Sequence, residues 1–518
     1  MRDIGRAGDA VTGRAVGIDL GTTMSAVGVV DRAGWAELVR NTGGQTLTPS
    51  VVLFTGPGQV LVGATARNSA VLHPDDCVQF IKREMGNPHY SFIDSHQVEH
   101  RPEQVSAYLL RALAEGAAEA LGEPVRDVVI TVPAYFDDTR RKATADAAEI
   151  AGLNLLRLVN EPTAAAISYG VQHGDAGTVL VYDLGGGTFD VTVMRVSDDG
   201  CEVIATDGDR NLGGFDFDNA LMRHVAERVA ALGGEEDLLD DPYLTAEVRE
   251  RCELAKTDLS QARRTVVRVG SGRRAHAVEI SREEFEAMIE PYLHRTEVLV
   301  EGLLEDAGLT WDAIDRVLPV GGSTRIPAVR ALLEKLSGKK PDLRVHPDEA
   351  VCLGAAHLAA QEAAAAAEAV PVGKQLAVRD VTSQSMGIVV TSDDDAQRLL
   401  NDVVIARNTP IPAMVERTYR TVAPDQDAVS VQLTEGEGED LERVNVLTEQ
   451  PVDLPPGLPA AAPLRLRMSY DVDGLVHAEL FDETHDRRLG EIQLERPLNL
   501  DAGRITEMRD AMSRTSVG

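Results

Sequence analysis

Apolar residues follow two different periods along this chain, and the change of period divides it in two. Up to residue 370, short apolar runs alternate with segments of helical pattern, which is typical of an α/β domain. From Val381 onward, apolar and polar residues alternate one by one, as in half-exposed strands. We therefore predict an α/β domain over residues 14–370, a linker over 371–380 and an antiparallel β domain over 381–497.

Within the predicted β domain, alternation and turn residues indicate how the strands are laid out. Two sets of apolar residues share strand faces: Val429, Val431 and Leu433, and then Leu464, Leu466, Met468 and Tyr470. The segments 423–427 and 471–474 are rich in Asp, Pro and Gly and predict hairpins between such strands.

Two segments of the α/β part repeat one design. VGIDLGTTMSAVGVV (16–30) and VLVYDLGGGTFDVTVMRV (179–196) each place two β-branched runs around an Asp-Leu-Gly turn, which predicts a hairpin. Each hairpin opens a block that mixes strands with helices. An internal duplication, with two similar lobes facing a cleft, is the expected result.

Two helices are predicted between these hairpins. A buried strand over 128–136 precedes a helix that Asp137 or Asp138 caps and Gly152 ends. A second helix follows in EPTAAAISYG (161–170), with a first-turn proline and Gly170 at its end. Its small side chains predict close packing against a neighbour.

Composition excludes several classes of function. Lys and Arg number 51 against 83 Asp and Glu, so the net charge of -32 disfavours binding to a phosphate backbone. The four cysteines form no CxxC pair, which argues against a zinc site or a disulfide framework and fits the cytoplasm. Residues 1–13 lack an apolar run and are expected to be a disordered extension, and 498–518 to supply one short helical tail.

The Asp-Leu-Gly turns are the first candidate chemistry. A strand ending in Asp19 or Asp183 and followed by Gly and Thr places a carboxylate beside exposed backbone N–H groups, which suits phosphate with magnesium. A plain β-turn uses the same residues, but two copies at matching strand ends favour the anion site.

Five segments carry a resemblance to a known family. DLGTTMSAV, VPAYF, VNEPTAAAISYG, DLGGGTFDVTV and VGGSTRIPAV are similar to the signatures of the seventy-kilodalton heat-shock, DnaK-like chaperones. The similarity continues through NTPIP (408–412) into the β region. It implies an actin-like two-lobe α/β ATPase domain followed by an antiparallel β-sandwich domain that binds peptide.

The resemblance also assigns roles to single residues. Lys82 would orient the attacking water opposite Glu161, with Asp183 and Thr188 beside the reacting phosphate. Asp19, Asp183 and Asp190 would hold Mg²⁺ largely through its waters, and K⁺ is implied near Asp183 and Asp190. The nucleotide ATP or ADP would lie against Gly21, Thr22, Thr23, Gly185, Gly186, Gly187, Glu253, Lys256, Ser260, Gly321, Gly322, Ser323 and Arg325.

The second domain departs further from the family pattern. The implied peptide groove comprises Ile388, Tyr419, Val422, Val429 and Val431, although these residues could equally form ordinary sandwich core. Arg379 stands in the linker where the family has an apolar residue, which predicts weaker linker docking because a buried unpaired charge is costly. Only the tail is left to supply the family's helical lid, so a lid is expected to be essentially absent.

The expected function is that of an ATP-dependent chaperone that binds unfolded or extended apolar segments, with hydrolysis as the affinity switch. Arg157, Asn160 and Thr163 match positions where a J-domain cochaperone acts, and a nucleotide exchange factor is a further implied partner. Two alternatives stay open: an ATP-binding sensor or scaffold for a folded partner, and a metabolite kinase of the same superfamily. No nucleic acid or membrane is expected as a partner.

Overall fold

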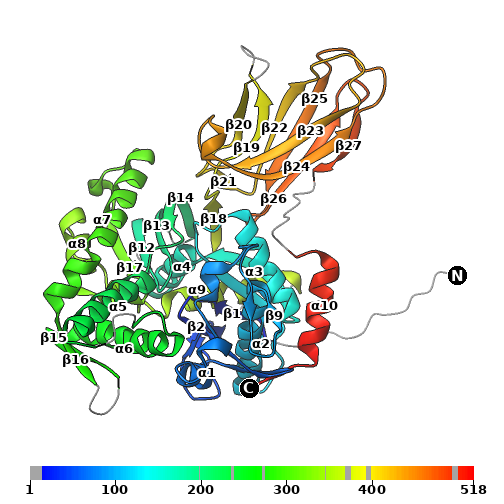
Figure 1. Ribbon diagram of the computed structural model, residues 1–518. Coiled ribbons are helices and arrows are strands. Elements are labelled where there is room, and N and C mark those ends of the chain that lie inside the picture. The colour runs from blue at the N-terminus through cyan, green and yellow to red at the C-terminus, as the bar shows by residue number, and fades with distance from the viewer. Residues whose placement is uncertain are drawn as a thin grey trace.

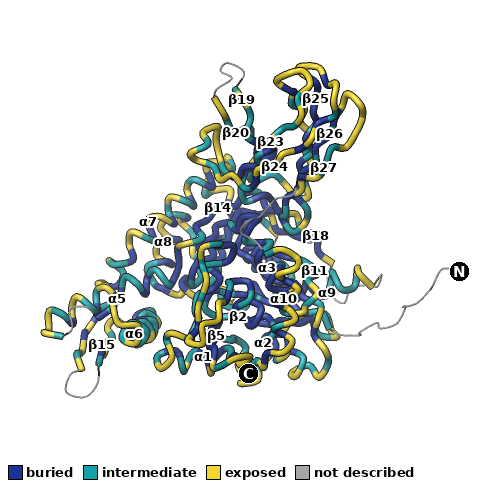
Figure 2. Tube along the Cα trace, turned by 45° about the vertical axis from the view of Figure 1, so that its right-hand side comes forward, coloured by how far each residue is buried: buried dark blue, intermediate teal, exposed yellow. Residues whose placement is uncertain are grey.

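A two-lobed α/β domain carries a separate β domain above it in the computed structural model (Figure 1). The structure describes residues 14–174, 176–197, 199–234, 238–270, 275–344, 346–367, 375–392, 398–492 and 500–518. The predicted extension over residues 1–13 therefore lies outside the described residues. Dark-blue buried segments run through both lobes in Figure 2, while exposed segments cover the margins of the β domain.

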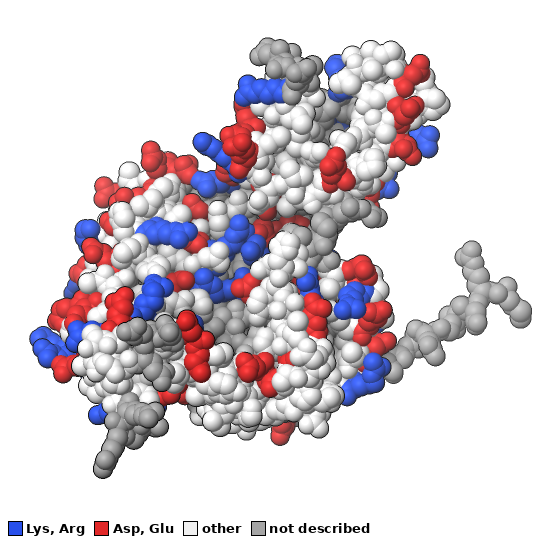
Figure 3. Space-filling view, in the orientation of Figure 1, with Lys and Arg blue, Asp and Glu red and all other residues white. Residues whose placement is uncertain are grey.

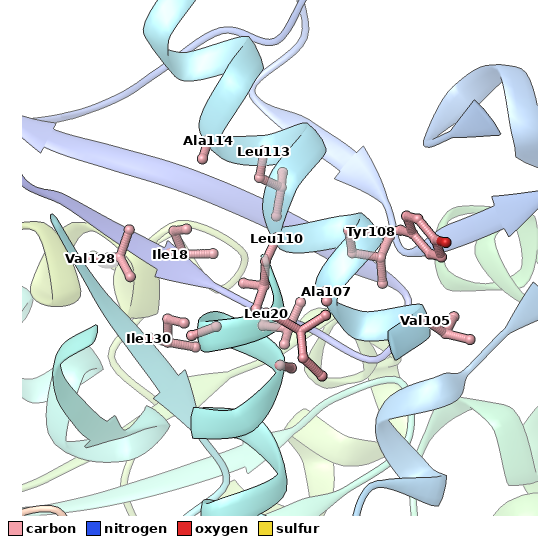
Figure 4. Packing of buried hydrophobic residues seen from close by; sticks show 14 of the residues in the cluster. Ile18, Leu20, Val105, Ala107, Tyr108, Leu110, Leu113, Ala114, Val128 and Ile130 are labelled. Carbon is pink, nitrogen blue, oxygen red and sulfur yellow. The ribbon is translucent and has the colours of Figure 1, made fainter. Parts of the chain in front are cut away.

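The first lobe is built on a mixed sheet in the order β11-β10-β1-β2-β3, with β4 paired to β2. Its strands are β1 (Val16–Asp19), β2 (Met24–Val30), β3 (Ala36–Leu38), β4 (Leu47–Pro49), β10 (Asp127–Val132) and β11 (Asn154–Asn160). Helices α2 (Pro102–Leu121) and α3 (Asp138–Ile150) accompany this sheet. In Figure 4, Ile18 and Ile130 from the sheet face Leu110 of α2 inside one apolar cluster. Burial of these apolar faces fixes the sheet that ends at Asp19.

A smaller subdomain of the first lobe carries the segment with Lys82. It comprises β5 (Val51–Gly56), β6 (Gln59–Val62), α1 (Ala64–Ser69), η1 (Pro74–Asp76), β7 (Cys77–Gln79), η2 (Ile81–Glu84), β8 (Phe92–Ile93) and β9 (Glu99–His100). Strand β5 pairs with β6 on one side and with β7 on the other. Lys82 lies in η2, a single 3-10 turn that follows β7 directly.

The second lobe repeats the central pattern of the first. Its strands are β12 (Gly177–Leu184), β13 (Phe189–Ser197), β14 (Gly200–Asp209) and β17 (Arg316–Val320). Strand β12 is antiparallel to β13 and parallel to β17, as β1 is antiparallel to β2 and parallel to β10. Both hairpins and the predicted duplication are confirmed.

Helices and a small hairpin complete the second lobe. They are α5 (Gly214–Ala231), α6 (Pro242–Gln261), β15 (Arg264–Val269), β16 (His276–Ser281), α7 (Arg282–Asp306), η4 (Trp311–Ala313), η5 (Gly322–Arg325) and α8 (Pro327–Ser337). Pro327 stands in the first turn of α8, where its missing backbone N–H costs no helical hydrogen bond. Helices α5 and α6 pack against each other, and α6 presents the residues predicted to face the nucleotide.

Two helices of small side chains join the lobes. Helix α9 (Ala350–Ala366) packs against α4 (Glu161–His173) and against β1 and β2. A Cβ added to Gly354 would lie 1.8 Å from the carbonyl oxygen of Ala164, so the two helix backbones nearly touch. The predicted close packing is confirmed. The predicted helix end at Gly170 is wrong, because α4 continues to Gly174, which has the left-handed φ of 64°.

The β domain is a sandwich of two four-stranded antiparallel sheets, ordered β20-β19-β23-β24 and β22-β25-β26-β27. The strands are β19 (Met386–Thr391), β20 (Leu399–Ile405), β22 (Ala413–Arg420), β23 (Ala428–Glu435), β24 (Asn445–Asp453), β25 (Pro463–Tyr470), β26 (Val476–Asp482) and β27 (Arg487–Ile492), with η6 (Leu441–Arg443) between β23 and β24. Segment 471–474 joins the β25–β26 hairpin, as predicted. Segment 423–427 does not join a hairpin, because it crosses between the sheets, from β22 to β23.

The described end of the predicted linker belongs to a sheet, and residues 371–374 lie outside the described residues. Strand β18 (Ala377–Val381) pairs in parallel with β14 of the second lobe and antiparallel with β21 (Pro410–Ile411). Arg379 points outward, with its side chain 74% exposed and its Nη1 4.0 Å from Oε1 of Glu202. The charge of Arg379 is therefore not buried, so the cost of an unpaired buried charge does not arise at this residue, and how strongly the linker docks stays a prediction.

The tail returns to the first lobe instead of the β domain. Helix α10 (Ala502–Ser513), the predicted short helix, contributes Ile505, Met508 and Met512 to the core of that lobe. Strand β28 (Ser516–Val517) then pairs in parallel with β6. Figure 1 shows α10 beside α3, far below the top of the sandwich. The segment therefore packs as part of the α/β domain.

Polar contacts join the β domain to the first lobe. Asp473 accepts a hydrogen bond from the backbone N–H of Leu158 at 2.9 Å. Asp138 accepts one from the N–H of Val476 at 3.0 Å. Glu435 is buried in the same interface and faces Asp137 and Asp138. Docking therefore places the carboxyl groups of Glu435, Asp137 and Asp138 close together.

We expect Glu435→Gln to stabilise the docked protein at high pH. Burial, and then the charges of Asp137 and Asp138, raise the pKa of Glu435 well above 4.5, while Arg210 opposes this rise. The resulting stability is full below pH 4.5 and is lost as pH rises through the raised pKa. The glutamine variant cannot ionise, so its melting temperature should exceed that of the wild type at high pH.

The control for this prediction is Glu449→Gln, at an exposed position of β24. Melting temperatures of all three proteins are measured across the pH range. The advantage of Glu435→Gln should shrink toward pH 4.5, and the control should follow the wild type. Parallel curves for wild type and Glu435→Gln would contradict the prediction.

Charged side chains are mixed on the face shown in Figure 3, where Lys and Arg lie among Asp and Glu instead of in one patch. On this face the basic residues form no continuous track, and the net charge of the chain is -32. Within the described part of the chain, every helix is too short or too polar to cross a membrane.

Candidate functional site

A cavity of about 500 Å³ lies between the two lobes, which is large enough for a nucleotide-sized ligand. Both Asp-Leu-Gly turns reach it, together with η2, the start of α4, one face of α6 and the turn after β17. The predicted residues that line it are Asp19, Gly21, Thr22, Thr23, Lys82, Glu161, Asp183, Gly185, Gly186, Thr188, Glu253, Lys256, Ser260, Gly321, Gly322, Ser323 and Arg325. Gly187 and Asp190 lie just behind this lining.

The second turn packs closely against the threonine side chains of the first. A Cβ on Gly186 would lie 2.5 Å from Cγ2 of Thr23, and one on Gly187 would lie 2.6 Å from Cγ2 of Thr22. A larger residue at either position would force these threonine side chains to move. The backbone N–H groups of these turns can then approach an anion closely.

Three carboxyl groups lie at the strand ends beneath these turns. Burial, and then the charge of Glu161, raise the pKa of both Asp19 and Asp190 to about 7. The same two causes raise the pKa of Asp183 well above its usual value. Lys82 lowers the pKa of all three carboxyl groups. Further positive charge in the site would likewise stabilise their ionised forms.

One carboxylate oxygen of Asp190 is available to bind a positively charged group. Its Oδ1 accepts the backbone N–H of Tyr135 at 2.9 Å, whereas its buried Oδ2 has no hydrogen-bond partner in the described protein. No group of three or more His, Cys, Asp or Glu among the described residues could hold a metal directly. Carboxylates set apart in this way suit Mg²⁺, which keeps most of its waters and takes phosphate oxygens as ligands.

Lys82 and Glu161 form an ion pair at the base of the cavity. Lys82 is 5% exposed and Glu161 is 8% exposed, so both charges are held away from bulk water. Burying a lysine requires a paired partner, and Glu161 at the first turn of α4 supplies it. The sequence prediction that these residues meet, 79 positions apart, is confirmed by the geometry.

One wall of the cavity is the face of α6 that carries Glu253, Lys256 and Ser260, the residues predicted to lie against the nucleotide. Lys256 donates hydrogen bonds to Oδ2 of Asp218 at 2.7 Å and to the carbonyl of Gly214 at 3.1 Å. Glu253 is paired with Arg67 of the first lobe at 2.9 Å, which links the lobes across the cavity mouth. On the opposite wall the side chain of Arg325 is 44% exposed and is paired with Asp348.

Sequence reasoning missed part of the lining. The additional residues are Met24, Leu47, Gln261, Val320, Ile326, Arg330, Pro347, Asp348 and Val351. Gln261 adjoins the predicted Ser260 and extends the same helical wall. Asp348 carries no motif of its own and is identified only by its contact with Arg325.

The residues predicted to form the peptide groove are not gathered in the same way. Ile388 and Val431 are buried in the sandwich core, and Tyr419 and Val429 pack against that core. Tyr419 also donates a hydrogen bond from Oη to Asp402 at 2.7 Å. Val422 is 78% exposed and stands apart in the crossing between the sheets. Four of the five thus serve the core, and a groove remains a prediction.

The positions predicted to meet a J-domain partner are occupied in this structure. Thr163 donates a hydrogen bond to Asp380 of the linker strand at 3.1 Å. Asn160 is 3% exposed and accepts from Arg141 at 2.6 Å. Arg157 pairs with Glu362 at 3.1 Å. The linker strand thus contacts Thr163, whereas Asn160 and Arg157 are held by residues of α3 and α9.

Comparison with known proteins shows which family this chain belongs to. A family model described as Hsp70 protein matches residues 15–517. The chain belongs to the Hsp70 family. The Chaperone protein DnaK of Thermotoga neapolitana is 38% identical over 477 residues, covering 90% of this chain and 78% of that protein. The Chaperone protein DnaK of Halobacterium salinarum is 38% identical over 504 residues, covering 96% and 77%.

Family membership settles the class of activity. This Hsp70 protein is an ATPase and an ATP-dependent molecular chaperone. The family implies actin-like lobes and a β-sandwich domain, and the mixed sheets of the α/β domain and the two sheets of the β domain are consistent with this. The metabolite-kinase alternative is thereby set aside.

Proposed function

We propose that this Hsp70 protein hydrolyses ATP in the cavity between its lobes and uses the nucleotide to control how tightly its β domain holds an extended apolar peptide. The observation that carries the proposal is the buried Lys82–Glu161 pair beside two facing glycine turns. Such a site positions phosphates and supplies charge, and phosphoryl transfer to water requires little else.

Each part of the site has a proposed task. Thr22, Thr23 and the backbone at Gly185–Gly187 hold the phosphates, and Thr188 and Lys82 orient the attacking water. Mg²⁺, when bound through waters at Asp19, Asp183 and Asp190, supplies positive charge to the phosphate oxygens. K⁺ beside Asp183 and Asp190 would serve the same electrostatic need. The walls of α6 and η5 enclose the adenosine.

The linker is the proposed path from nucleotide to peptide. Asp380 is 8% exposed in β18 and accepts a hydrogen bond from Thr163 of α4, the helix that begins with Glu161. A change in the site that moves α4 would therefore move β18 and the β domain joined to it. We propose that this docked structure corresponds to the state that releases peptide readily.

The experiment is the dissociation rate of a fluorescent extended apolar peptide in ATP and in ADP. ATP should speed release from the wild type and from Arg379→Ala, since Arg379 is exposed. Asp380→Ala should lose most of this acceleration, because the Thr163 contact disappears. Equal release of peptide from the wild type in both nucleotides would instead favour the sensor or scaffold alternative.

The proposed partners follow from the same surfaces. An unfolded polypeptide would bind at the margin of the sandwich near Tyr419, Val422 and Val429. A J-domain cochaperone would bind near Arg157, Asn160 and Thr163, and Thr163 would become accessible to it when the linker strand leaves. A nucleotide exchange factor would act by opening the lobes. The free cysteines, three of them buried, fit the proposed cytoplasmic location.

A further inference from the structure

A cluster of two aromatic rings and two arginines joins the lobes beside the nucleotide cavity. Phe80 of the first lobe and Phe215 of the second meet with ring centroids 4.7 Å apart, in a T-shaped arrangement. Arg83 lies over the Phe215 ring at 4.5 Å, and Arg249 lies over the same ring at 4.8 Å. Both the edge-to-face contact of the rings and the cation–π contacts are attractive.

On the first-lobe side, this cluster is continuous with the segment that carries Lys82. Phe80 is the residue immediately before η2, and Lys82 and Arg83 both lie within that single turn. Phe80 has a φ of 60°, in the left-handed region that phenylalanine rarely adopts. Such a conformation persists where contacts hold the residue in place, and the Phe215 ring provides that contact.

On the second-lobe side, the cluster is continuous with the phosphate-binding turn. The backbone N–H of Phe215 donates a hydrogen bond to the carbonyl of Gly186 at 2.7 Å. The neighbouring N–H of Gly214 donates to the carbonyl of Gly185 at 3.0 Å. Phe215 is therefore attached by its backbone to the turn predicted to hold the phosphates.

The two arginines tie the rings to both lobes. Arg83 crosses from η2 and donates a hydrogen bond to Oδ2 of Asp216 at 3.0 Å. Arg249 comes from α6 and also lies over the Phe80 ring, at 5.6 Å. One Nη atom of Arg249 is buried without a hydrogen-bond partner in the described protein, and its guanidinium lies against the two rings and near the charge of Asp218.

We propose that Phe80, Phe215, Arg83 and Arg249 form an interlobe clamp that closes the lobes and places Lys82 in register with the Gly185–Gly187 turn. These are positioning residues, because they act through η2 and the turn and do not themselves touch the phosphates. The clamp opens when nucleotide leaves. The inference rests on the proposed role of Lys82 for its effect on hydrolysis, but not for its effect on nucleotide release.

The test uses the full-length protein and a fluorescent ADP. Phe215→Leu removes the ring but keeps an apolar side chain of similar length, and Phe215→Tyr keeps the ring. We expect ADP to leave Phe215→Leu about tenfold faster than wild type, and kcat for ATP hydrolysis to fall about tenfold, whereas Phe215→Tyr stays within about twofold. Phe92→Leu is the control, because the Phe92 ring packs on Phe54 inside the first lobe.

A double variant separates the clamp from ordinary packing. If Phe80 and Phe215 act through their mutual contact, Phe80→Leu combined with Phe215→Leu should release ADP no faster than about twice the rate of either single variant. Multiplied effects, or release from Phe215→Leu at the wild-type rate, would overturn the proposal. If ADP leaves Phe215→Leu faster but kcat is unchanged, the interlobe contact is supported and its positioning of Lys82 is not. The proposal as stated would then be rejected.

Discussion

Lys82→Ala is expected to lower the rate of ATP hydrolysis by about a hundredfold or more while ATP still binds. The lysine is buried against Glu161 at the base of the cavity, so its charge acts in a region with little water to screen it. Removal of one preorganised charged donor from such a site typically costs a factor of about 10²–10³ in kcat. Single-turnover hydrolysis and the Kd for ATP, measured on the same protein, separate the two effects.

The matched control for Lys82 is Lys335→Ala. Lys335 is 72% exposed on α8 and pairs with Glu297 at 3.5 Å, outside the cavity. Its loss should leave hydrolysis within about twofold of wild type, since exposed ion pairs contribute little. Hydrolysis by Lys82→Ala at a third of the wild-type rate or more would remove Lys82 from the proposed mechanism. Loss of ATP binding would show that Lys82 binds the nucleotide and does not act on the attacking water.

Gly354→Ala is expected to destabilise the α/β domain by more than about 2 kcal/mol, although one methyl group is added. The new Cβ would lie 1.8 Å from the carbonyl oxygen of Ala164, so α9 and α4 must move apart. These helices carry the core between the lobes, and Glu161 at the start of α4 would shift with them. Thermal unfolding and the rate of ATP hydrolysis should therefore both be affected.

Gly302→Ala makes the same chemical change in the interior of another helix. Nothing lies within 4 Å of a Cβ added to Gly302 in α7. There alanine should stabilise the protein by about 0.5–1 kcal/mol, because glycine loses more backbone freedom on folding. The two variants should thus change the melting temperature in opposite directions. A neutral result for Gly354→Ala would mean that α4 and α9 can separate at little cost.

The sequence was sufficient to predict the local parts of the site. Both Asp-Leu-Gly turns follow β-branched runs, and the structure forms the two expected hairpins with Asp19 and Asp183 at their strand ends. The spacing of Glu253, Lys256 and Ser260 placed them on one face of α6. Such features follow from turn chemistry and helical period, which act over a few residues.

Features that depend on distant partners could not be predicted in this way. Helix α4 continues beyond Gly170, where a Cβ would lie only 3.0 Å from Val196. The Arg379 side chain stays exposed because the linker strand turns it outward, toward Glu202. The contact of Phe80 with Phe215 joins residues 135 positions apart, and neither belongs to a motif. No local pattern marks such pairs.

The sequence by itself determined the mixed α/β part, the alternating β part, the duplicated turns and the family to which they belong. Only the tertiary structure decided that β18 completes a sheet of the second lobe, that α10 and β28 pack on the first lobe, and that Glu435 is buried against Asp137 and Asp138. The physical reason is range: propensity and period act between neighbours in the chain, whereas docking depends on burial and charge between surfaces that meet only after folding.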